Sequence, residues 1–303
     1  MANTHAIKAR IKGVESIGQI TKSMKLVAAS KLRRVQESRG SLVLMAESSR
    51  RALADVSRGG AELENPFLSK REEIKRVCFV LFVGNRGLCG IYNSAVLRFA
   101  EEQIRRCDKE SFLVVCGSWG QDLIEGAGHN VRRRFSELND MPRSEDAVEV
   151  TEYLKNMYLS GEADEVVMVY QKFCSVMSQK PSTLVLFPLD TAADIPQEDE
   201  EDPESPAAES APGGSDYIFE PDMKSVLDAL VELYISSSVF SVMLDARTGE
   251  HAARMTSMNS AAESTEEMLE QLRLELNHAR QAAITTEISE IVGGAQALSD
   301  SAH

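Results

Sequence analysis

The sequence predicts an α/β protein with two long helices, one at each end of the chain, that pair as an antiparallel coiled coil. Three observations support this prediction. Both ends of the chain have long stretches without proline. The apolar residues of these stretches recur with helical periodicity, and the middle of the chain alternates short apolar runs with amphipathic stretches. The expected boundaries are 1–60 for the first helix, 74–189 for an α/β domain, 190–216 for an acidic insertion and 217–303 for the last helix.

The first helix is predicted over about residues 2–57, which contain neither proline nor a strand-like run. Gly59-Gly60 and Asn65-Pro66 are expected to end it. At about 1.5 Å per residue, this helix is roughly 80 Å long. Its apolar residues recur at gaps of three and four, as expected for one face of a helix: Ile7, Ile11, Val14, Ile17, Ile20, Met24 and Val27.

The middle of the chain has the alternation that is typical of a Rossmann-like domain with a mostly parallel sheet. Buried strands are expected at the apolar runs 77–83, 112–116, 166–170 and 183–187, with a further short strand at 131–135. Helices are expected between them, near 93–106, 119–127 and 145–159.

Charge is distributed unevenly along the chain. The total is 33 basic and 47 acidic residues, a net charge of -14, which argues against general nucleic-acid binding. Residues 1–51 hold eleven Lys or Arg and three acids, whereas 194–222 hold eleven acids and no base. The segment 190–216 is rich in Pro, Glu, Asp, Ser and Ala, so we expect it to be disordered. A solvated loop is favoured over a docking segment.

The last helix is predicted from Pro221 to about Ser299, which would make it roughly 115 Å long. Gaps of three and four alternate along a heptad pattern at Met255, Met258, Ala262, Thr265, Leu269, Leu272, Leu276, Ala279 and Ala283. Two such helices beside a compact domain suggest force transmission, spacing or scaffolding, and not a substrate pocket.

The five cysteines show no CxxC spacing, and neither they nor the five histidines form a metal-ligand pattern. We therefore expect reduced thiols, no metal and no cofactor. No apolar run reaches the roughly 18 residues of a membrane span, and no signal peptide is evident. Any membrane association is expected to be through partners.

Three stretches of the sequence resemble the gamma subunit family of F-type ATP synthases. They are IKARIKGV at 7–14 continuing to ITKSMKLVAASKLRR at 20–34; GNRGLCGIYN at 84–93; and ARMTSM at 253–258 followed by LNHARQAAITTEISEIVGGA at 276–295. The resemblance covers nearly the whole chain except 190–216. It implies a rotor shaft that transmits torque between an ion-driven ring of c subunits and a catalytic ring of alpha and beta subunits.

The resemblance also implies partners and a location. One copy per complex would contact the alpha and beta subunits, an epsilon-type subunit and the c ring, with no catalytic site or cofactor of its own. The complex would lie on the cytoplasmic face of a bacterial plasma membrane; the alternatives are the matrix face of the mitochondrial inner membrane and the stromal face of the thylakoid membrane.

The resemblance assigns contact residues, each of which has a plainer interpretation. Contacts with the alpha/beta ring are expected at Met24, Lys25, Lys31, Arg280, Gln281, Thr285, Ile288 and Ile291. Contacts with the c ring, at the foot of the shaft, are expected at Tyr217 and Glu220. The plainer interpretations are coiled-coil packing or solvated side chains for the ring contacts, and a cap for the last helix at the foot.

The glycine pattern of Gly84, Gly87 and Gly90 is interpreted as a structural turn. A phosphate-binding loop would have GxxxxGK[ST] or GxGxxG, and neither is present. The family usually has an acid where Asn85 stands, so a charge pair at this position is not expected. Nothing near Cys89 suggests a catalytic thiol.

Two other classes of protein compete with this interpretation. A Rossmann-type nucleotide-binding enzyme is disfavoured because the glycine fingerprint and a catalytic constellation are missing. A coiled-coil scaffold that binds nucleic acid through its basic N-terminal helix is disfavoured by the acidic remainder and by the lack of interleaved aromatic residues.

Overall fold

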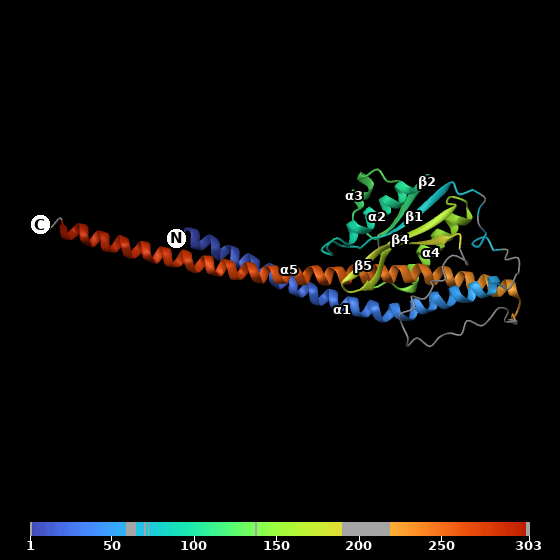
Figure 1. Cartoon of the computed structure of the whole chain (residues 1–303), viewed down its shortest axis with the longest axis horizontal. Coiled ribbons are helices and arrows are strands. Elements are labelled where there is room, and N and C mark those ends of the chain that lie inside the picture. Colours follow the sequence, from blue (N-terminus) through green and yellow to red (C-terminus); the bar gives the residue numbers. More distant parts are fainter. Residues whose placement is uncertain are drawn as a thin grey trace. The chain divides into compact units, whose positions relative to one another are not determined.

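Figure 1 shows a computed structural model of the chain. The structure describes residues 2–58, 65–69, 71, 73–136, 138–189 and 219–300. Long helices open and close it, with five strands and three shorter helices between them. In chain order the elements are α1 (Ala2–Arg58), β1 (Arg76–Phe82), α2 (Tyr92–Arg106), β2 (Glu110–Cys116), α3 (Gln121–Gly126), β3 (Val131–Phe135), α4 (Ser144–Leu159), β4 (Glu165–Ser175), β5 (Ser178–Phe187) and α5 (Met223–Asp300).

The five strands form one sheet in the order β3-β2-β1-β4-β5. All neighbouring pairs are parallel except β4 and β5, which are antiparallel. The predicted mostly parallel sheet is confirmed. β1 lies at the centre, and six of its seven residues are buried. A parallel strand covered on both faces has a continuous apolar run, so the run of six apolar residues in β1 follows from its position.

The last two strands form a longer hairpin than the sequence predicts (Figure 1). The apolar runs at 166–170 and 183–187 mark only its buried half. The outer half carries polar side chains such as Lys172 and Lys180, which lie opposite each other. Because this half is polar, apolar runs in the sequence do not indicate it. β5 also contains Pro181, which the sheet tolerates because β5 is an edge strand.

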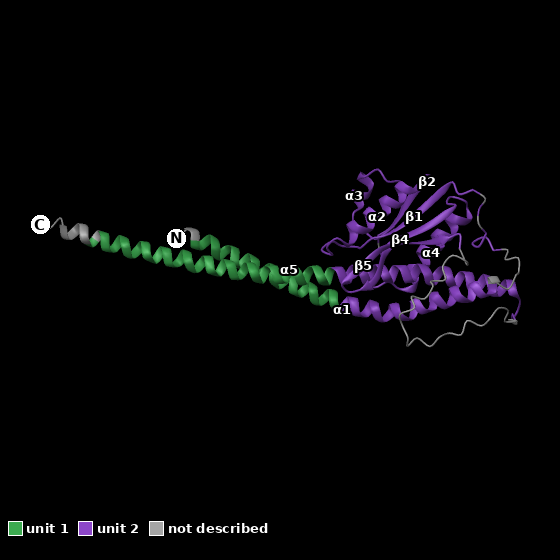
Figure 2. Cartoon of the chain, viewed as in Figure 1, with its two compact units in different colours: residues 1–29, 254–303 green, residues 30–253 purple. Residues whose placement is uncertain are grey.

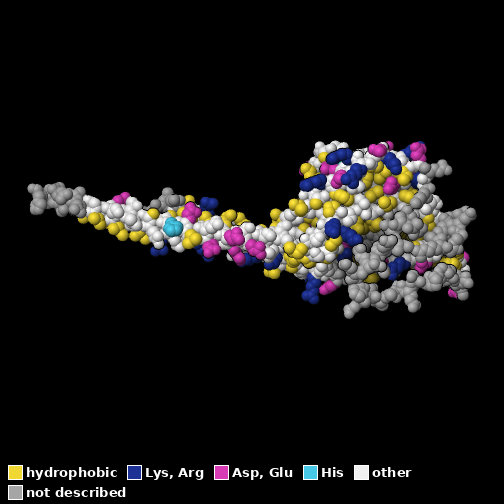
Figure 3. Space-filling model, viewed as in Figure 1, with side chains coloured by type: hydrophobic (Ala, Val, Ile, Leu, Met, Phe, Trp, Pro, Cys, Tyr) yellow, Lys and Arg dark blue, Asp and Glu magenta, His cyan; other side chains and the backbone are white. Residues whose placement is uncertain are grey.

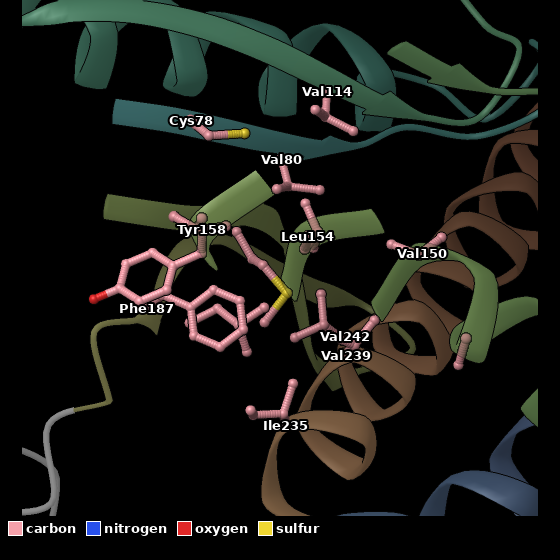
Figure 4. Packing of buried hydrophobic residues seen from close by; sticks show 14 of the residues in the cluster. Cys78, Val80, Val114, Val150, Leu154, Tyr158, Phe187, Ile235, Val239 and Val242 are labelled. Carbon is pink, nitrogen blue, oxygen red and sulfur yellow. The ribbon is translucent and has the colours of Figure 1, made fainter. Parts of the chain in front are cut away.

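The sheet has a separate apolar core on each face, because alternate residues of a strand point to opposite faces. On one face the strands pack against α4 and the first part of α5, and Figure 4 shows Ile235, Val239 and Val242 of α5 in this cluster with Leu154 of α4. On the other face they pack against α2 and α3. The segment of α5 from Leu227 to Ala246 is therefore part of the core of the α/β domain.

The chain divides into two compact units, residues 1–29 with 254–303 and residues 30–253 (Figure 2). Unit 1 contains one end of each long helix. Its helices are antiparallel, because Glu15 pairs with Arg273 at 3.2 Å and Lys22 pairs with Glu266 at 2.6 Å.

The heptad pattern predicted for the last helix agrees with burial in α5. Its nine positions are all buried or half-buried, with Met258, Ala262, Thr265 and Leu272 the most enclosed. The face predicted for the first helix is partly wrong, because Ile17, Ile20 and Val27 are 52%, 59% and 56% exposed.

One series of enclosed positions along α1 in unit 1 alternates gaps of four and three: Ile7, Ile11, Val14, Gly18, Thr21, Lys25 and Ala28. Four residues beside this series are half-buried as well, namely Thr4, Glu15, Met24 and Ala29. A count of large apolar residues misses this pattern, because small and polar residues occupy four of the seven positions. They allow close approach: a Cβ atom on Gly18 would lie 3.1 Å from Oγ1 of Thr265.

This close approach gives a prediction for two glycines of the same helix. We expect Gly18→Leu to lower the free energy of unfolding of unit 1 by about 1–3 kcal/mol, because the added side chain overfills the contact with Thr265. A Cβ atom added at Gly13 would meet no atom of another part of the chain within 4 Å. Gly13→Ala is therefore expected to stabilise the helix by about 0.5–1 kcal/mol. Thermal unfolding followed by far-ultraviolet circular dichroism would measure both, and equal effects of the two variants would contradict the proposed contact.

Among the described residues, one helix is long and apolar enough to cross a membrane by length and composition alone, namely α5 over Met223–Gly293. Forty-four per cent of its apolar 18-residue window is buried inside the protein. The core helix of a soluble protein passes the same test.

Candidate functional site

The loops that follow β1 and β2 meet at one edge of the sheet, because the two strands are parallel neighbours. The backbone is tightly packed there. A Cβ atom on Gly84 would lie 2.8 Å from Cδ of Glu250 in α5, and one on Gly117 would lie 2.3 Å from the carbonyl oxygen of Val83. Trp119 donates its backbone N–H to the carbonyl oxygen of Gly84 at 3.0 Å. The loop after β1 is thus held between α5 and the loop after β2.

One stretch of α5 beside this loop buries an unusual number of polar side chains. All are 5% exposed or less: Asp245, Arg247, Thr248, Glu250 and His251. Arg247 pairs with Glu250 at 2.7 Å and donates a second hydrogen bond to Oδ1 of Asn85 at 2.9 Å. Sequence reasoning missed this cluster. An Arg and a Glu three residues apart are also common on exposed helix faces, so this spacing by itself does not predict that the pair is buried.

Asn85 connects this cluster with a second ion pair. Its Nδ2 donates to the carbonyl oxygen of Leu138 at 2.7 Å and approaches Asp140 at 3.4 Å. Asp140 pairs with Lys31 of α1 at 2.5 Å, and its carbonyl oxygen lies 3.1 Å from Nε2 of His251. The connection between β3 and α4 is therefore joined to both long helices.

Partial burial by itself would raise the pKa of Asp140, but the hydrogen bond and charge of Lys31, aided by Asn85 and His251, lower it to about 2. This value lies below the ordinary 3.8. A carboxyl group with a depressed pKa stabilises the fold at pH values above its ordinary pKa, and this contribution is lost as the pH falls.

Replacing Lys31 with methionine is expected to lower the free energy of unfolding at neutral pH. The difference from the unaltered protein should become smaller between about pH 4 and pH 2, because Asp140 becomes protonated in both proteins over this range. Urea unfolding at a series of pH values would measure the difference between the two free energies. A difference that stays constant down to pH 2 would contradict this pairing.

A further ion pair joins the two long helices inside unit 2. Arg39 of α1 binds Asp245 of α5 and lies over the ring of Phe173, 5.6 Å from its centroid. Burial raises the pKa of Asp245, and Arg39 offsets part of this increase. The pair therefore links α1, α5 and the β4–β5 hairpin.

The residues assigned to the alpha/beta ring lie in different environments. Met24 and Lys25 are half-buried, and Lys25 donates to Asn259 at 2.6 Å. Lys31 is bound to Asp140 in unit 2. The C-terminal residues of the group are all exposed, namely Arg280, Gln281, Thr285, Ile288 and Ile291. The structure does not bring the members of this group together in one cluster, and their contacts with a ring stay a prediction.

The last turns of α5 expose large apolar side chains. Ile284, Ile288, Ile291 and Val292 are between 45% and 71% exposed. Figure 3 shows hydrophobic side chains gathered along this part of the helix on the face in view. Exposed apolar side chains in such a row are typical of a surface that binds another protein.

Of the two foot residues, Tyr217 lies outside the described residues, and Glu220 is exposed just before α5. Glu220 borders an open pocket of about 680 Å³ that Arg51 and Asp55 of α1 also line. Asp222 accepts a hydrogen bond from the backbone N–H of Ser225 at 2.9 Å, as expected of a helix cap. The cap interpretation and the c-ring contact are compatible, and the contact stays a prediction.

The three glycines of the motif differ in their surroundings. Gly84 packs against α5, Gly90 has a positive φ of 57°, and Gly87 has no atom within 4 Å of an added Cβ. These facts fit the structural-turn interpretation. Cys89 is buried, with Sγ 3.3 Å from Nδ2 of Asn93. Among the residues that the structure describes, no group of three or more His, Cys, Asp or Glu could hold a metal ion.

The chain is similar to known proteins over nearly its whole length. Residues 3–298 match the family model described as ATP synthase. The ATP synthase gamma chain of Desulforamulus reducens is 37% identical, over 98% of this chain and 100% of that protein. The gamma chain of Chlorobium phaeobacteroides (strain DSM 266) is 39% identical, over 96% and 97%.

Solved structures also resemble this chain. One is a chain of the Euglena gracilis mitochondrial ATP synthase, OSCP/F1/c-ring, with a TM-score of 0.64 and 19% identity over 98% of this chain and 95% of that one. Another is from the central stalk and c ring of the Tetrahymena thermophila mitochondrial enzyme, with a TM-score of 0.52 and 19% identity over 80% and 99%. At this identity the likeness concerns the fold.

Proposed function

Because this chain belongs to the family of ATP synthase gamma chains, we propose that it is the rotor shaft of an F-type ATP synthase. It transmits torque between the c ring in the membrane and the alpha/beta ring, for synthesis or hydrolysis of ATP. The observation that carries this proposal is the helix pair of unit 1, in which both helices keep an alternating pattern of enclosed residues over several turns.

The physical requirement for such a shaft is stiffness. One elementary charge that crosses 100 mV supplies about 2.3 kcal/mol, so several such steps must be stored before one ATP is released. Two paired helices resist bending and unwinding through their packing and their backbone hydrogen bonds. The close contact at Gly18 and Thr265 and the cross-helix ion pairs at Lys22 and Glu15 support this role.

The role of the chain in this proposal is mechanical, and the catalytic sites lie on the beta subunits. One polar side chain of the loop after β1 supports this view, because it is engaged within the protein: the amide of Asn85 binds Arg247 and the carbonyl group of Leu138.

The proposed partners are the alpha and beta subunits, an epsilon-type subunit and the c ring, with one copy of this chain in each complex. The exposed apolar residues at the end of α5 suit the interior of the ring, and the start of α5 near Glu220 suits the c ring. The bacterial relatives favour the cytoplasmic face of a plasma membrane, to which the chain is attached through its partners.

The test of this function is purification of the tagged chain from gently solubilised membranes of its source, with mass spectrometry and an ATPase assay. Recovery of alpha, beta, epsilon-type and c subunits together with ATPase activity is the expected result. Recovery of the chain alone, or with nucleic acid, would overturn the proposal in favour of a coiled-coil scaffold.

The contacts at the end of α5 have a separate test. We expect Arg280→Ala combined with deletion of residues 288–303 to lower the torque of the reconstituted complex, because both changes remove surface that faces the ring in this proposal. The fold of the sheet should be unaffected, since none of the altered residues lies in unit 2. Single-molecule rotation would measure the torque. An unchanged torque would show that these contacts are wrongly assigned, although the family would stand.

A further inference from the structure

We propose that Asn85 is a positioning residue that fixes the sheet to both long helices at one edge. It is the centre of a chain of contacts, named here the Asn85 bridge, that runs from α5 through two loops to α1. The bridge consists of Lys31, Asn85, Leu138, Asp140, Arg247 and His251, all of which belong to unit 2.

On the side of α5, two side chains one helical turn apart make the contacts. Arg247 donates to Oδ1 of Asn85 at 2.9 Å, and Nε2 of His251 lies 3.1 Å from the carbonyl oxygen of Asp140. Glu250 holds the guanidinium in place at 2.7 Å from the same helix. Because Arg247 is 4% exposed, water competes little for its hydrogen bonds.

On the side of α1, Lys31 reaches the same connection between β3 and α4 through the carboxylate of Asp140 at 2.5 Å. Asn85 joins the two sides by donating to the carbonyl oxygen of Leu138 at 2.7 Å. Without Asn85, α5 would keep only the contact between His251 and Asp140 in this bridge.

The chemistry of the amide explains why asparagine suits this position. Its side chain accepts through Oδ1 and donates through Nδ2, so it can bind a guanidinium and a carbonyl group at the same time. Aspartate could not donate to Leu138 and would place a second negative charge near Asp140. Alanine would leave Arg247 buried with one hydrogen-bond partner fewer.

The mechanical importance of the Asn85 bridge rests on the proposed function. A partner bound to the sheet turns with the helices only if the sheet does not rotate relative to them. The core of unit 2 resists separation through apolar contacts, which have little directionality. Directional hydrogen bonds and ion pairs at the edge of the sheet add resistance to rotation about the helix axis.

The experiment measures the angular freedom of the sheet in the full-length chain, free of partners. Spin labels are placed on Arg33→Cys in α1, where the native side chain is 84% exposed, and on Lys109→Cys before β2, which is also exposed. Cys107 and Cys174 are replaced by serine, since the other three thiols are buried. Double electron–electron resonance then gives the distribution of distances between the labels.

We expect Asn85→Ala to broaden this distribution and Lys31→Met, which removes only the contact with α1, to broaden it less. The matched control is Asn139→Ala. Asn139 borders the same polar pocket as Asn85, but its amide binds Asp146 of its own segment and neither long helix. Its removal is expected to leave the distribution unchanged.

Unchanged widths in both Asn85→Ala and Lys31→Met would overturn the proposal, as would equal broadening by Asn139→Ala, which would indicate general loosening of the loops. If Asn85→Ala does not fold, the comparison of Lys31→Met with Asn139→Ala decides. The measurement needs no partner. If the purification test overturned the rotor function, the result of the distance measurement would therefore still hold. If the distance measurement overturned the Asn85 bridge, the rotor function would still hold.

Discussion

Replacing Gly117 with alanine is expected to be among the most damaging single substitutions in this chain. Gly117 has a φ of 128°, which side chains other than glycine rarely adopt, and an added Cβ would lie 2.3 Å from the carbonyl oxygen of Val83. The neighbouring atom belongs to the backbone directly after β1, where the N–H of Val83 donates to the carbonyl oxygen of Cys116, so it cannot move aside without disturbing this edge of the sheet. Strain of this kind costs about 1–3 kcal/mol before the clash is counted, and we expect a loss of at least 3 kcal/mol in total.

Trp119 is the only tryptophan of the chain and lies two residues away, so its fluorescence during urea unfolding would report this loss. Hydrogen exchange of the β1 and β2 amides would confirm it independently of the probe. The matched control is Gly87→Ala in the loop after β1, where no atom lies within 4 Å of the added Cβ. Similar stability of the two variants would contradict the packing described for the sheet edge.

Removal of the buried carboxylate of Glu250 is expected to have an effect of similar size. Glu250→Ala should lower the free energy of unfolding by about 3–5 kcal/mol, because it leaves the charge of Arg247 buried without its ionic partner. The alanine also opens a space against Gly84. The same urea unfolding experiment measures the loss.

Glu232 provides the control for Glu250, since it is also an acid of α5 with an ion pair, at 2.6 Å from Lys155. Its side chain is 51% exposed, so Glu232→Ala is expected to cost no more than about 1 kcal/mol. If the two substitutions had the same effect, burial would not be the property that makes the pair of Arg247 and Glu250 important.

Apolar periodicity in the sequence was sufficient to predict much of the fold. The heptad positions of α5 and the buried strands were found because burial there is achieved with apolar side chains, and their spacing directly reflects the period of a helix or a strand. The resemblance of the terminal motifs to a known family was likewise readable from residues alone, and the family comparison agrees with it.

Some features were decided only by tertiary structure, because the residue type at these positions does not indicate whether the position is buried. Gly18 and Thr21 are enclosed while Ile17 and Ile20 are exposed, since two closely packed helices select small residues for their contact. Hydrophobicity alone ranks these positions in the opposite order.

For the charged residues of α5, residue type predicts burial even less well. Arg247 and Glu250 would be placed on the surface by any single-sequence argument, because burial of a charge is favourable only when a partner waits at the right distance. Glu250 is the ionic partner of Arg247 within the helix, and a further hydrogen-bond partner, Asn85, comes from a loop more than a hundred residues earlier in the chain. The sequence by itself therefore determined the helices, the strands and the family, whereas the three-dimensional fold decided which polar side chains hold the sheet to the helices.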